Sequence, residues 1–182
     1  VMLRKTNHIC GLPQNSGDPS PFTARGVWQG IRATAKVTFG SDSLDGLTIA
    51  VQGLGKVGFD LCRLLHNSGA KLIVANRSNK EIAQKAAEEF GAIVVPTEEI
   101  YSQKCDIFSP NAMGAIINPT TIPMLNCKAV AGGSNNQILD DASGLALKAR
   151  GIYYAPDFVI NGGGVINAAA EVDGPYNKEA VL

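Results

Sequence analysis

Apolar and polar positions change their spacing repeatedly along this chain from residue 46 onward. Short apolar or β-branched runs predict strands, and the stretches between them have apolar positions at helical spacing. The predicted strands span residues 48–52, 71–76, 92–95, 106–109, 128–131 and 152–155. The predicted helices span residues 56–67, 79–90 and 143–150, with shorter candidates at 98–102 and 120–125. Alternating strands and helices predict an α/β fold, a Rossmann-type, doubly wound and mainly parallel sheet in a single domain.

The two ends of the chain have a different pattern. Residues 1–22 are rich in turn-forming residues, and we interpret them as a lead-in or hinge segment. Residues 23–182 would form the folded domain, beginning with a long helix from Thr23 to about Gly40. Near the end of the chain, a glycine cluster at 162–164 precedes a last predicted helix over 165–172.

The most informative motif is Gly-x-Gly-x-x-Gly directly after the first predicted strand, at the start of the helix predicted over 56–67. Gly53 permits a tight turn, Gly55 lets a phosphate approach the backbone, and Gly58 lets the helix pack closely. This strand, turn and helix place a pyrophosphate at a helix N-terminus, which predicts a dinucleotide site; an ordinary structural turn is the alternative. The predicted phosphate-binding residues are Gly53, Leu54, Gly55, Lys56, Val57 and Gly58.

Composition narrows the possible partners. The 182 residues are 45% hydrophobic, and 16 basic residues balance 16 acidic ones. Without a basic cluster there is no electrostatic signal for binding nucleic acid or an anionic membrane. No run is long and apolar enough for a membrane span, and the first residues lack the apolar core of a signal peptide. We therefore expect a cytoplasmic protein whose partners are small molecules or copies of itself.

The four cysteines give no sign of a metal site. Cys10, Cys62, Cys105 and Cys127 are spread along the chain, with no Cys-x-x-Cys pair and no histidine at ligand spacing. We interpret them as reduced and mostly buried thiols.

Five blocks, in order, carry a resemblance to a known family. They are SGDPSPFTA (16–24), VQGLG (51–55), CDIFSP (105–110), NNQ (135–137) and APDFVINGGGVIN (155–167). Together they resemble the cofactor-binding domain of the glutamate/leucine/phenylalanine/valine dehydrogenases, the leucine-specific members above all. The resemblance spans nearly the whole chain and implies a nicotinamide cofactor, NAD or NADP, an amino-acid substrate, and a homo-oligomer in the full enzyme.

The resemblance implies roles for three polar residues. Thr23 would hydrogen-bond the nicotinamide carboxamide, although a threonine at the start of a helix is also an ordinary N-cap. Asn136 resembles the asparagine beside the nicotinamide ribose and would otherwise be a turn residue. Asn161 resembles the asparagine that orients the nicotinamide and the substrate.

Val165 and Ala168 match the family positions that line the pocket for the amino-acid side chain. Because both are apolar, they favour an aliphatic or aromatic substrate over glutamate, whose buried carboxylate would lack a partner. The alternative is that both are core residues on an amphipathic helix.

The segment Asn76-Arg77-Ser78 departs from the pattern of NAD-preferring proteins. Those proteins carry an acid here, about 20 residues past the glycines, to bind the ribose 2′-hydroxyl. Arg77 can instead pair with a 2′-phosphate, and Asn76 and Ser78 can donate hydrogen bonds. The segment favours NADP over NAD; a solvated arginine in a turn is the competing explanation.

A second departure concerns catalysis. The family's catalytic lysines and aspartate belong to a separate N-terminal domain, and no matching Gly-Gly-Lys segment occurs in these residues. We therefore assign no catalytic residue and expect the isolated chain to bind cofactor without turnover. The full enzyme would oxidatively deaminate an apolar, leucine-like L-amino acid to a 2-oxo acid and ammonia. A stand-alone nucleotide-sensing module and an unrelated NADP-dependent reductase are the alternatives.

Overall fold

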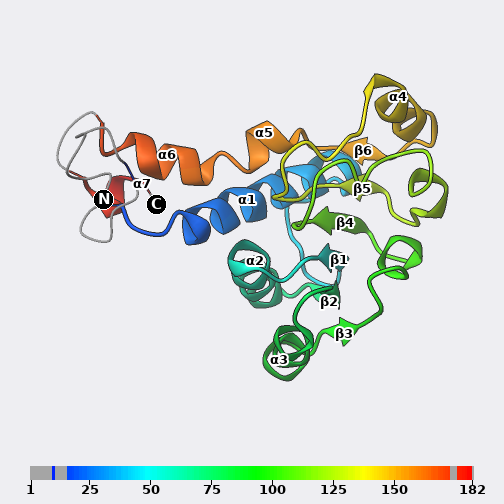
Figure 1. The fold of residues 1–182 in the computed structure, drawn as a ribbon, viewed down its shortest axis with the longest axis horizontal. Helices are drawn as coiled ribbons and strands as arrows, with labels where there is room; N and C mark the ends of the chain where they lie inside the picture. Colours follow the sequence, from blue (N-terminus) through cyan, green and yellow to red (C-terminus); the bar gives the residue numbers. More distant parts are fainter. Residues whose placement is uncertain (1–9, 11–15, 173–175, 182) are drawn as a thin grey trace.

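The computed structural model of the protein describes residues 10, 16–172 and 176–181. Its centre is a six-stranded sheet with the order β3-β2-β1-β4-β5-β6, in which every pair of neighbours is parallel (Figure 1). The strands are β1 (Thr48–Gln52), β2 (Lys71–Ala75), β3 (Ile93–Val94), β4 (Ile107–Pro110), β5 (Ala129–Val130) and β6 (Tyr153–Tyr154). The Rossmann-type, doubly wound fold predicted from the sequence is confirmed.

Strand order creates a crevice between β1 and β4. The chain moves outward from β1 to β2 and β3, then returns to place β4 on the other side of β1, in register from Ile49 opposite Ile107. Loops leaving β1 and β4 therefore diverge to opposite faces of the sheet. Open α/β sheets bind ligands outside the carboxyl ends of the strands at such a switch point.

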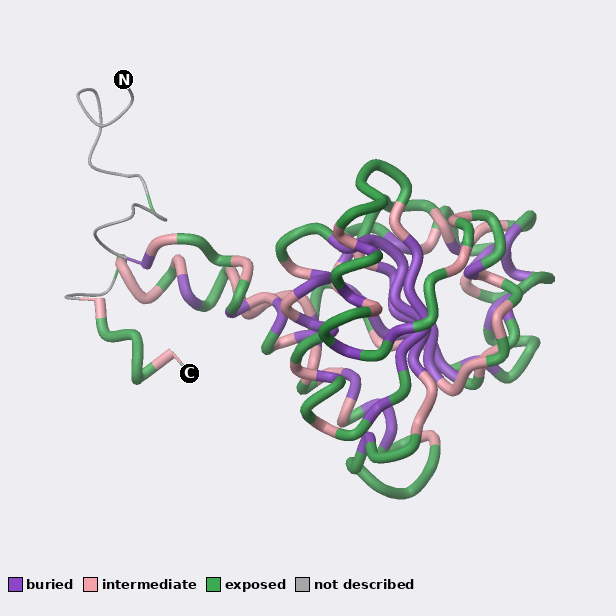
Figure 2. Tube along the Cα trace, turned by 90° about the horizontal axis from the view of Figure 1, so that it is seen from below, coloured by how far each residue is buried: buried purple, intermediate pink, exposed green. Residues whose placement is uncertain are grey.

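Helices cover both faces of the sheet, and two apolar clusters fill the space between the layers. One cluster joins the sheet to α1, α2 and α3, with Ile31, Leu61 and Phe90 among its members. The other contains Ile100, Ile122 and Leu147 and joins the opposite face to η2, η3 and α4. The helices are α1 (Ser20–Phe39), α2 (Lys56–Asn67), α3 (Lys80–Phe90), α4 (Asp141–Ala149), α5 (Asp157–Ile160), α6 (Gly163–Ala169) and α7 (Lys178–Val181), with the 3-10 turns η2 (Ile100–Ser102) and η3 (Ile122–Met124). Figure 2 shows the buried strands running through the centre between exposed helix surfaces.

The N-terminal part of α1 and the whole of α6 project from the sheet side by side (Figure 1). Glycines permit this close contact. A Cβ on Gly163 would lie 2.1 Å from the carbonyl oxygen of Phe22, and one on Gly30 would lie 2.6 Å from the side chain of Ile160. The α1 backbone therefore sits directly against the segment that the resemblance assigns to the nicotinamide and substrate.

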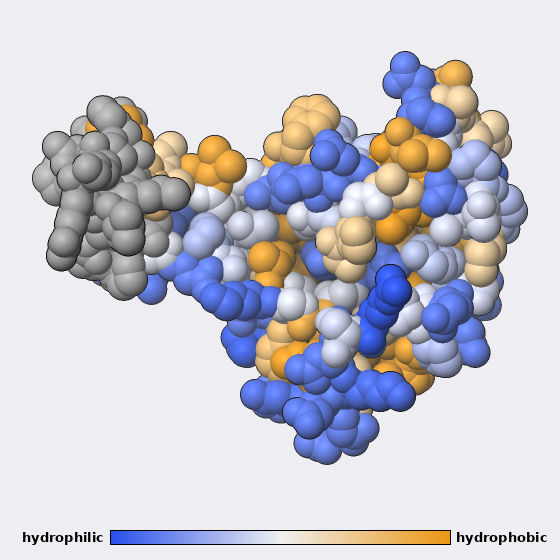
Figure 3. All heavy atoms as spheres, viewed as in Figure 1, coloured by the Kyte–Doolittle hydropathy of each residue, from blue (hydrophilic) through white to orange (hydrophobic). Residues whose placement is uncertain are grey.

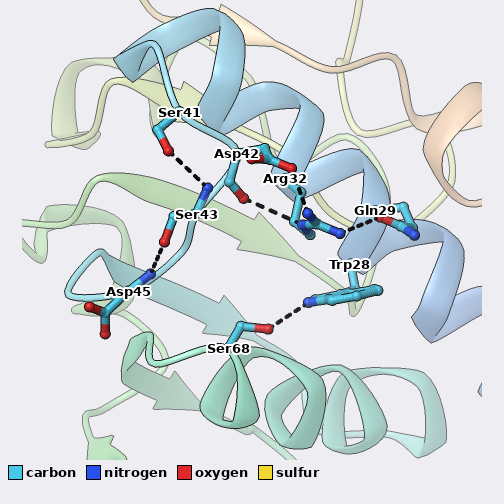
Figure 4. Close-up of polar contacts among 8 residues, drawn as sticks. All are labelled: Trp28, Gln29, Arg32, Ser41, Asp42, Ser43, Asp45 and Ser68. Atoms are coloured by element: carbon cyan, nitrogen blue, oxygen red, sulfur yellow. Dashed lines mark hydrogen bonds and ion pairs between the residues drawn. The ribbon is translucent and has the colours of Figure 1, made fainter.

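Polar contacts fix the middle of α1 on the body of the domain (Figure 4). The Trp28 indole nitrogen donates to Ser68 Oγ at the end of α2, 2.9 Å away. Arg32 forms an ion pair with Asp42 in the connection from α1 to β1, and its guanidinium also lies over the Trp28 ring. These contacts anchor the middle of α1 to the end of α2 and to the connection that leads into β1.

Several predicted boundaries were wrong. Helix α1 begins at Ser20, not Thr23, because prolines at 19 and 21 suit a first helical turn, where no amide donor is required. The predicted helices at 98–102 and 120–125 are the short 3-10 turns η2 and η3, and the last predicted helix (165–172) is α6, which begins at Gly163 and ends at Ala169. The short helices α5 and α7 were not predicted. Most of the predicted lead-in segment, 1–9 and 11–15, lies outside the described residues.

Two further expectations concern the burial of the cysteines and the presence of membrane-spanning helices. Of the cysteines, Cys62 is buried, Cys10 is exposed, and Cys105 and Cys127 are only partly buried, so the expectation of mostly buried thiols was wrong. No helix within the described ranges combines the length and the hydropathy that crossing a bilayer requires.

Candidate functional site at the carboxyl edge of the sheet

The glycine turn after β1 has the geometry that its sequence predicts. Gly53 has a positive φ of 90°, and a Cβ there would lie 2.8 Å from that of Ala112. A Cβ on Gly58 would lie 2.0 Å from the carbonyl oxygen of Gly53, so only glycine lets α2 start this close to the strand end. At Gly55 a Cβ would meet nothing within 4 Å. Packing explains Gly53 and Gly58, whereas Gly55 faces open space.

The N-terminus of α2 lacks the side-chain cap that two other helices have. Asn79 accepts hydrogen bonds from the amides of Glu81 and Ile82 in the first turn of α3, and Asp140 accepts from Ser143 in α4. At α2 the capping position is Gly55, and no side chain of the residues that the structure describes caps the first turn. Amide donors at the positive end of a helix dipole favour an anion.

Asn76, which follows β2, connects the glycine turn to the next loop. Its Oδ1 accepts from the Leu54 amide at 3.0 Å, and its Nδ2 donates to the Asn79 carbonyl oxygen at 2.9 Å. An aspartate could accept from Leu54, but it would face the Asn79 carbonyl without a proton to share. The Asn76 side chain therefore holds both loops because it has an acceptor and a donor, whereas an ionised acid would have only acceptors.

A cavity of about 620 Å³ lies beside the glycine turn, lined among others by Gly55, Lys56, Asn76 and Ser78. Arg77 is exposed between Asn76 and Ser78, at the end of the β2 strand. The structure therefore brings the predicted phosphate-binding turn and the segment predicted to select NADP into one region.

Lys56 makes an ion pair at this cavity. Its Nζ lies 2.7 Å from Asp18 Oδ2, while Asp18 Oδ1 accepts from the amide and hydroxyl of Ser20 at 2.9 and 2.6 Å. The hydrogen bond from Lys56, followed by those from Ser20, holds the pKa of Asp18 well below its usual range, and Asp18 in turn raises the pKa of Lys56. The glycine turn is thereby tied to the segment that leads into α1.

Asn111, just after β4, links three loops across the crevice, and the sequence analysis missed it. Its backbone N–H donates to the Gln52 carbonyl oxygen at 2.7 Å, and its side-chain Oδ1 accepts from the Gly133 backbone N–H at 2.9 Å. Its Nδ2 donates to Ser109 Oγ and to the Ser109 carbonyl, each at 3.0 Å. In the sequence it resembles a turn residue, and only its place beyond β4, beside β1, could have marked it.

Asn161 joins this network from the other side. Its Nδ2 lies 3.3 Å from the Gly133 carbonyl oxygen and 2.6 Å from Asn135 Oδ1. Asn136 has a positive φ of 52° and an exposed side chain, and it lines a different cavity, which Asp157 also lines. The structure thus connects Asn161 to the crevice through Gly133, with Asn135 rather than Asn136 as its side-chain partner.

Thr23 lies inside α1, where it contacts the α6 segment. Its hydroxyl donates to the Pro19 carbonyl at 3.1 Å, and a Cβ on Gly164 would lie 2.4 Å from this hydroxyl. The alternative role of Thr23 as an N-cap was wrong, because Pro19 occupies the capping position. Thr23 and Asn161 therefore flank the same glycine cluster.

The two predicted pocket residues lie on α6. Val165 is 72% exposed and Ala168 is partly buried. Val165 is not a core residue, so that alternative was wrong for it. Ile166 next to it is 62% exposed, and Figure 3 shows apolar surface near α6. Residues Val165 and Ile166 thus leave an apolar face without cover among the described residues.

Comparison with known proteins agrees with this geometry. The model of the glutamate/leucine/phenylalanine/valine dehydrogenase family matches residues 71–179. Leucine dehydrogenase of Thermoactinomyces intermedius is 51% identical over 185 residues, which cover 100% of this chain and 50% of the relative. Phenylalanine dehydrogenase of Lysinibacillus sphaericus is 47% identical over 186 residues, which cover 98% of this chain and 49% of the relative.

A solved structure gives the same result in three dimensions. The crystal structure of L-tryptophan dehydrogenase from Nostoc punctiforme superposes with a TM-score of 0.86 at 43% identity, over 90% of this chain and 49% of that one. The chain spans about half the length of the curated relatives it matches. The resemblance inferred from the five sequence blocks is confirmed, and an unrelated reductase is excluded: the chain belongs to the glutamate/leucine/phenylalanine/valine dehydrogenase family.

Proposed function

We propose that this chain is the NAD(P)-binding part of an amino-acid dehydrogenase that oxidatively deaminates an apolar, leucine-like L-amino acid to a 2-oxo acid and ammonia. The observation that carries the proposal is the crevice between β1 and β4. It presents an uncapped helix N-terminus and a glycine with open space where a side chain would stand. The relatives that span the chain are leucine, phenylalanine and tryptophan dehydrogenases, which supports the substrate class.

The residues present fit a nicotinamide dinucleotide. The first amides of α2, from Lys56 onward, would bind the pyrophosphate, with Gly55 allowing its close approach. Thr23 and Asn161, which flank the glycine cluster, would orient the nicotinamide, and Asn136 would serve the adjoining ribose. When bound, the cofactor supplies the redox chemistry by accepting a hydride from the substrate Cα.

We propose NADP as the preferred cofactor. The carboxyl end of β2 offers Asn76, Arg77 and Ser78, with no carboxylate to repel a 2′-phosphate. Because Asn76 is committed to Leu54 and Asn79, the direct contacts fall to the exposed Arg77 and to Ser78 in the cavity wall. A guanidinium pairs with phosphate more strongly than a neutral donor does.

The apolar face of α6 would form one wall of the substrate pocket. Val165 and Ala168 would contact the amino-acid side chain, and the exposure of Val165 leaves it available for this contact. A lysine base from a further domain would complete the site, as the sequence resemblance implies. The full enzyme would be a homo-oligomer, as the sequence resemblance implies.

The glycine turn provides the direct test. Gly55→Val should abolish measurable binding of NADPH and NADH to the 182-residue chain in isothermal titration. Its melting temperature should change little, because no atom lies within 4 Å of the added Cβ. The matched control is Gly144→Ala on α4, whose Cβ would make only ordinary contacts, at 3.8 and 3.9 Å, with Ile138. Retained affinity in Gly55→Val would show that the phosphates bind elsewhere.

A further inference from the structure

Cys105 and Cys127 lie next to each other at the amino edge of the sheet, opposite the edge with the glycine turn. Each precedes a strand by two residues, and the strands pair with Ile107 opposite Ala129. The Cys105 amide donates to the Asn126 carbonyl at 3.1 Å, so the pairing of the two chains extends back to the cysteines. Neighbouring strands are about 4.8 Å apart. That spacing lies within the Cα separation of roughly 4.4–6.8 Å that a disulfide requires.

Each thiol affects the ionisation of the other. Donation from the Cys105 thiol toward the Cys127 sulfur lowers the pKa of Cys127 and raises that of Cys105, so Cys105 keeps its proton. Backbone amides and the positive charge of Arg150 further lower the pKa of Cys127. The Arg150 guanidinium is fixed there by the carbonyl oxygens of Ile122 and Leu125. Cys127 is thus the thiol better able to act as a nucleophile.

The surroundings of the pair leave a route for a small oxidant. Both side chains pack on the apolar cluster of α4, η2 and η3, yet neither is fully buried. Exposed residues flank them at Lys104 and Lys128. Cys62, by contrast, is completely buried, and burial raises its pKa to about 12. Among the described residues no group of three possible metal ligands occurs, so the pair lacks the ligands of a metal site.

We propose that Cys105 and Cys127 form a redox-active dithiol that peroxides oxidise to an intramolecular disulfide. The Cys127 thiolate attacks one oxygen of hydrogen peroxide, the O–O bond breaks, and hydroxide leaves, giving the sulfenic acid of Cys127. The hydroxide takes up the proton that the Cys127 thiol released on ionisation, which gives the first molecule of water. The Cys105 thiol then attacks the Cys127 sulfur, the S–O bond breaks, and water leaves with the Cys105 proton. The two sulfurs lose two electrons in total, and one molecule of peroxide is reduced to two molecules of water.

Peptide mass analysis tests the proposal without depending on cofactor binding. A Cys10→Ser variant removes the exposed thiol, and the folded protein is treated with hydrogen peroxide, denatured, alkylated and cut with trypsin. Lys104 and Lys128 bound a tryptic peptide that contains both cysteines. It should be lighter by two hydrogen atoms, resist alkylation and return to the dithiol form with a reducing agent, while Cys62 stays alkylatable. A peptide still alkylated at both cysteines would overturn the proposal.

Single variants test the division of roles. Cys105→Ser should stop at the Cys127 sulfenic acid, which dimedone traps, whereas Cys127→Ser should give at least about tenfold less dimedone adduct, because Cys105 remains a thiol. Equal trapping in the two variants would overturn the assignment of Cys127 as the attacking group. Circular dichroism before treatment establishes that each variant is folded, and the peptide analysis above decides the disulfide itself without either variant.

Discussion

Two asparagines connect the loops around the crevice, in addition to the ion pair between Lys56 and Asp18. Asn76 joins the glycine turn to the loop before α3, and Asn111 joins the ends of β1, β4 and β5. Each uses both its acceptor and its donor, so neither an acid nor an apolar residue of similar size could replace it. These two positions determine where the neighbouring backbone amides point.

The glycines of the turn could be predicted because each is required by the local backbone geometry of the motif. Gly53 needs its positive φ and Gly58 its close contact, and both follow from the motif. Asn111 could not be predicted from local signals, since its partners Gln52 and Gly133 are distant in sequence. The contact of Asn135 with Asn161 could not be predicted either, because the two residues are distant in sequence and are brought together only by folding.

Arg77 should discriminate between the two cofactors. Arg77→Ala should weaken NADPH binding by roughly 10-fold or more, because a charge-assisted hydrogen bond contributes about 1.5–3 kcal/mol. Binding of NADH should change by less than about twofold, since without the 2′-phosphate the guanidinium has no special partner. Isothermal titration measures both affinities, and Lys80→Ala, another exposed cation near the same loop, is the control. An equal effect on both cofactors would contradict a role in selecting NADP.

The bounds of long, regular elements were easier to predict than those of short ones. The bounds of β1 and α2 agree with the prediction, and α3 begins one residue after its predicted start because Asn79 caps it. The strands β3, β5 and β6 contain only two residues each, although their apolar runs are longer. An apolar run indicates that a segment is buried. A strand also requires a neighbouring strand in register, and that pairing depends on residues distant in the sequence.

Close packing of α1 on α6 gives a test at the level of elements. Gly163→Ala should destabilise the chain by about 1–3 kcal/mol, because the new Cβ would lie 2.1 Å from the Phe22 carbonyl oxygen and the backbone must shift. Gly144→Ala, in the open helix α4, should be neutral or stabilise by up to about 1 kcal/mol. Urea unfolding followed by circular dichroism measures both. Equal stabilities would mean that the two helices separate without cost.

At the scale of the whole molecule, the described residues form a six-stranded sheet, and no catalytic group for the proposed reaction is assigned among them. The order of the six strands follows from long-range pairing, and local patterns indicated only the class of fold. The apolar face at Val165 and Ile166 is exposed, and Lys56 is paired with Asp18 at the glycine turn rather than near α6. Under the proposed function, the turn would serve cofactor binding and the apolar face would form one wall of the substrate pocket.

Turnover is therefore expected to require more than these 182 residues. With NAD or NADP and leucine, valine or phenylalanine, the chain should give no rate above background, while the same sample binds cofactor by titration. Absorbance of the reduced nicotinamide follows the reaction, and full-length leucine dehydrogenase of Thermoactinomyces intermedius is the positive control. A substrate-dependent rate would show that the chain contains the complete catalytic machinery.

The hydrogen bonds of Asn111 have a consequence for the thermodynamics of binding. Because the backbone and the side chain of one residue together hold the loops after β1, β4 and β5, those loops cannot explore positions independently of one another. The conformational entropy of these loops is lost when the protein folds and need not be lost again when a ligand arrives. For a site assembled from three separate loops, affinity then depends on contacts with the ligand and very little on ordering the protein.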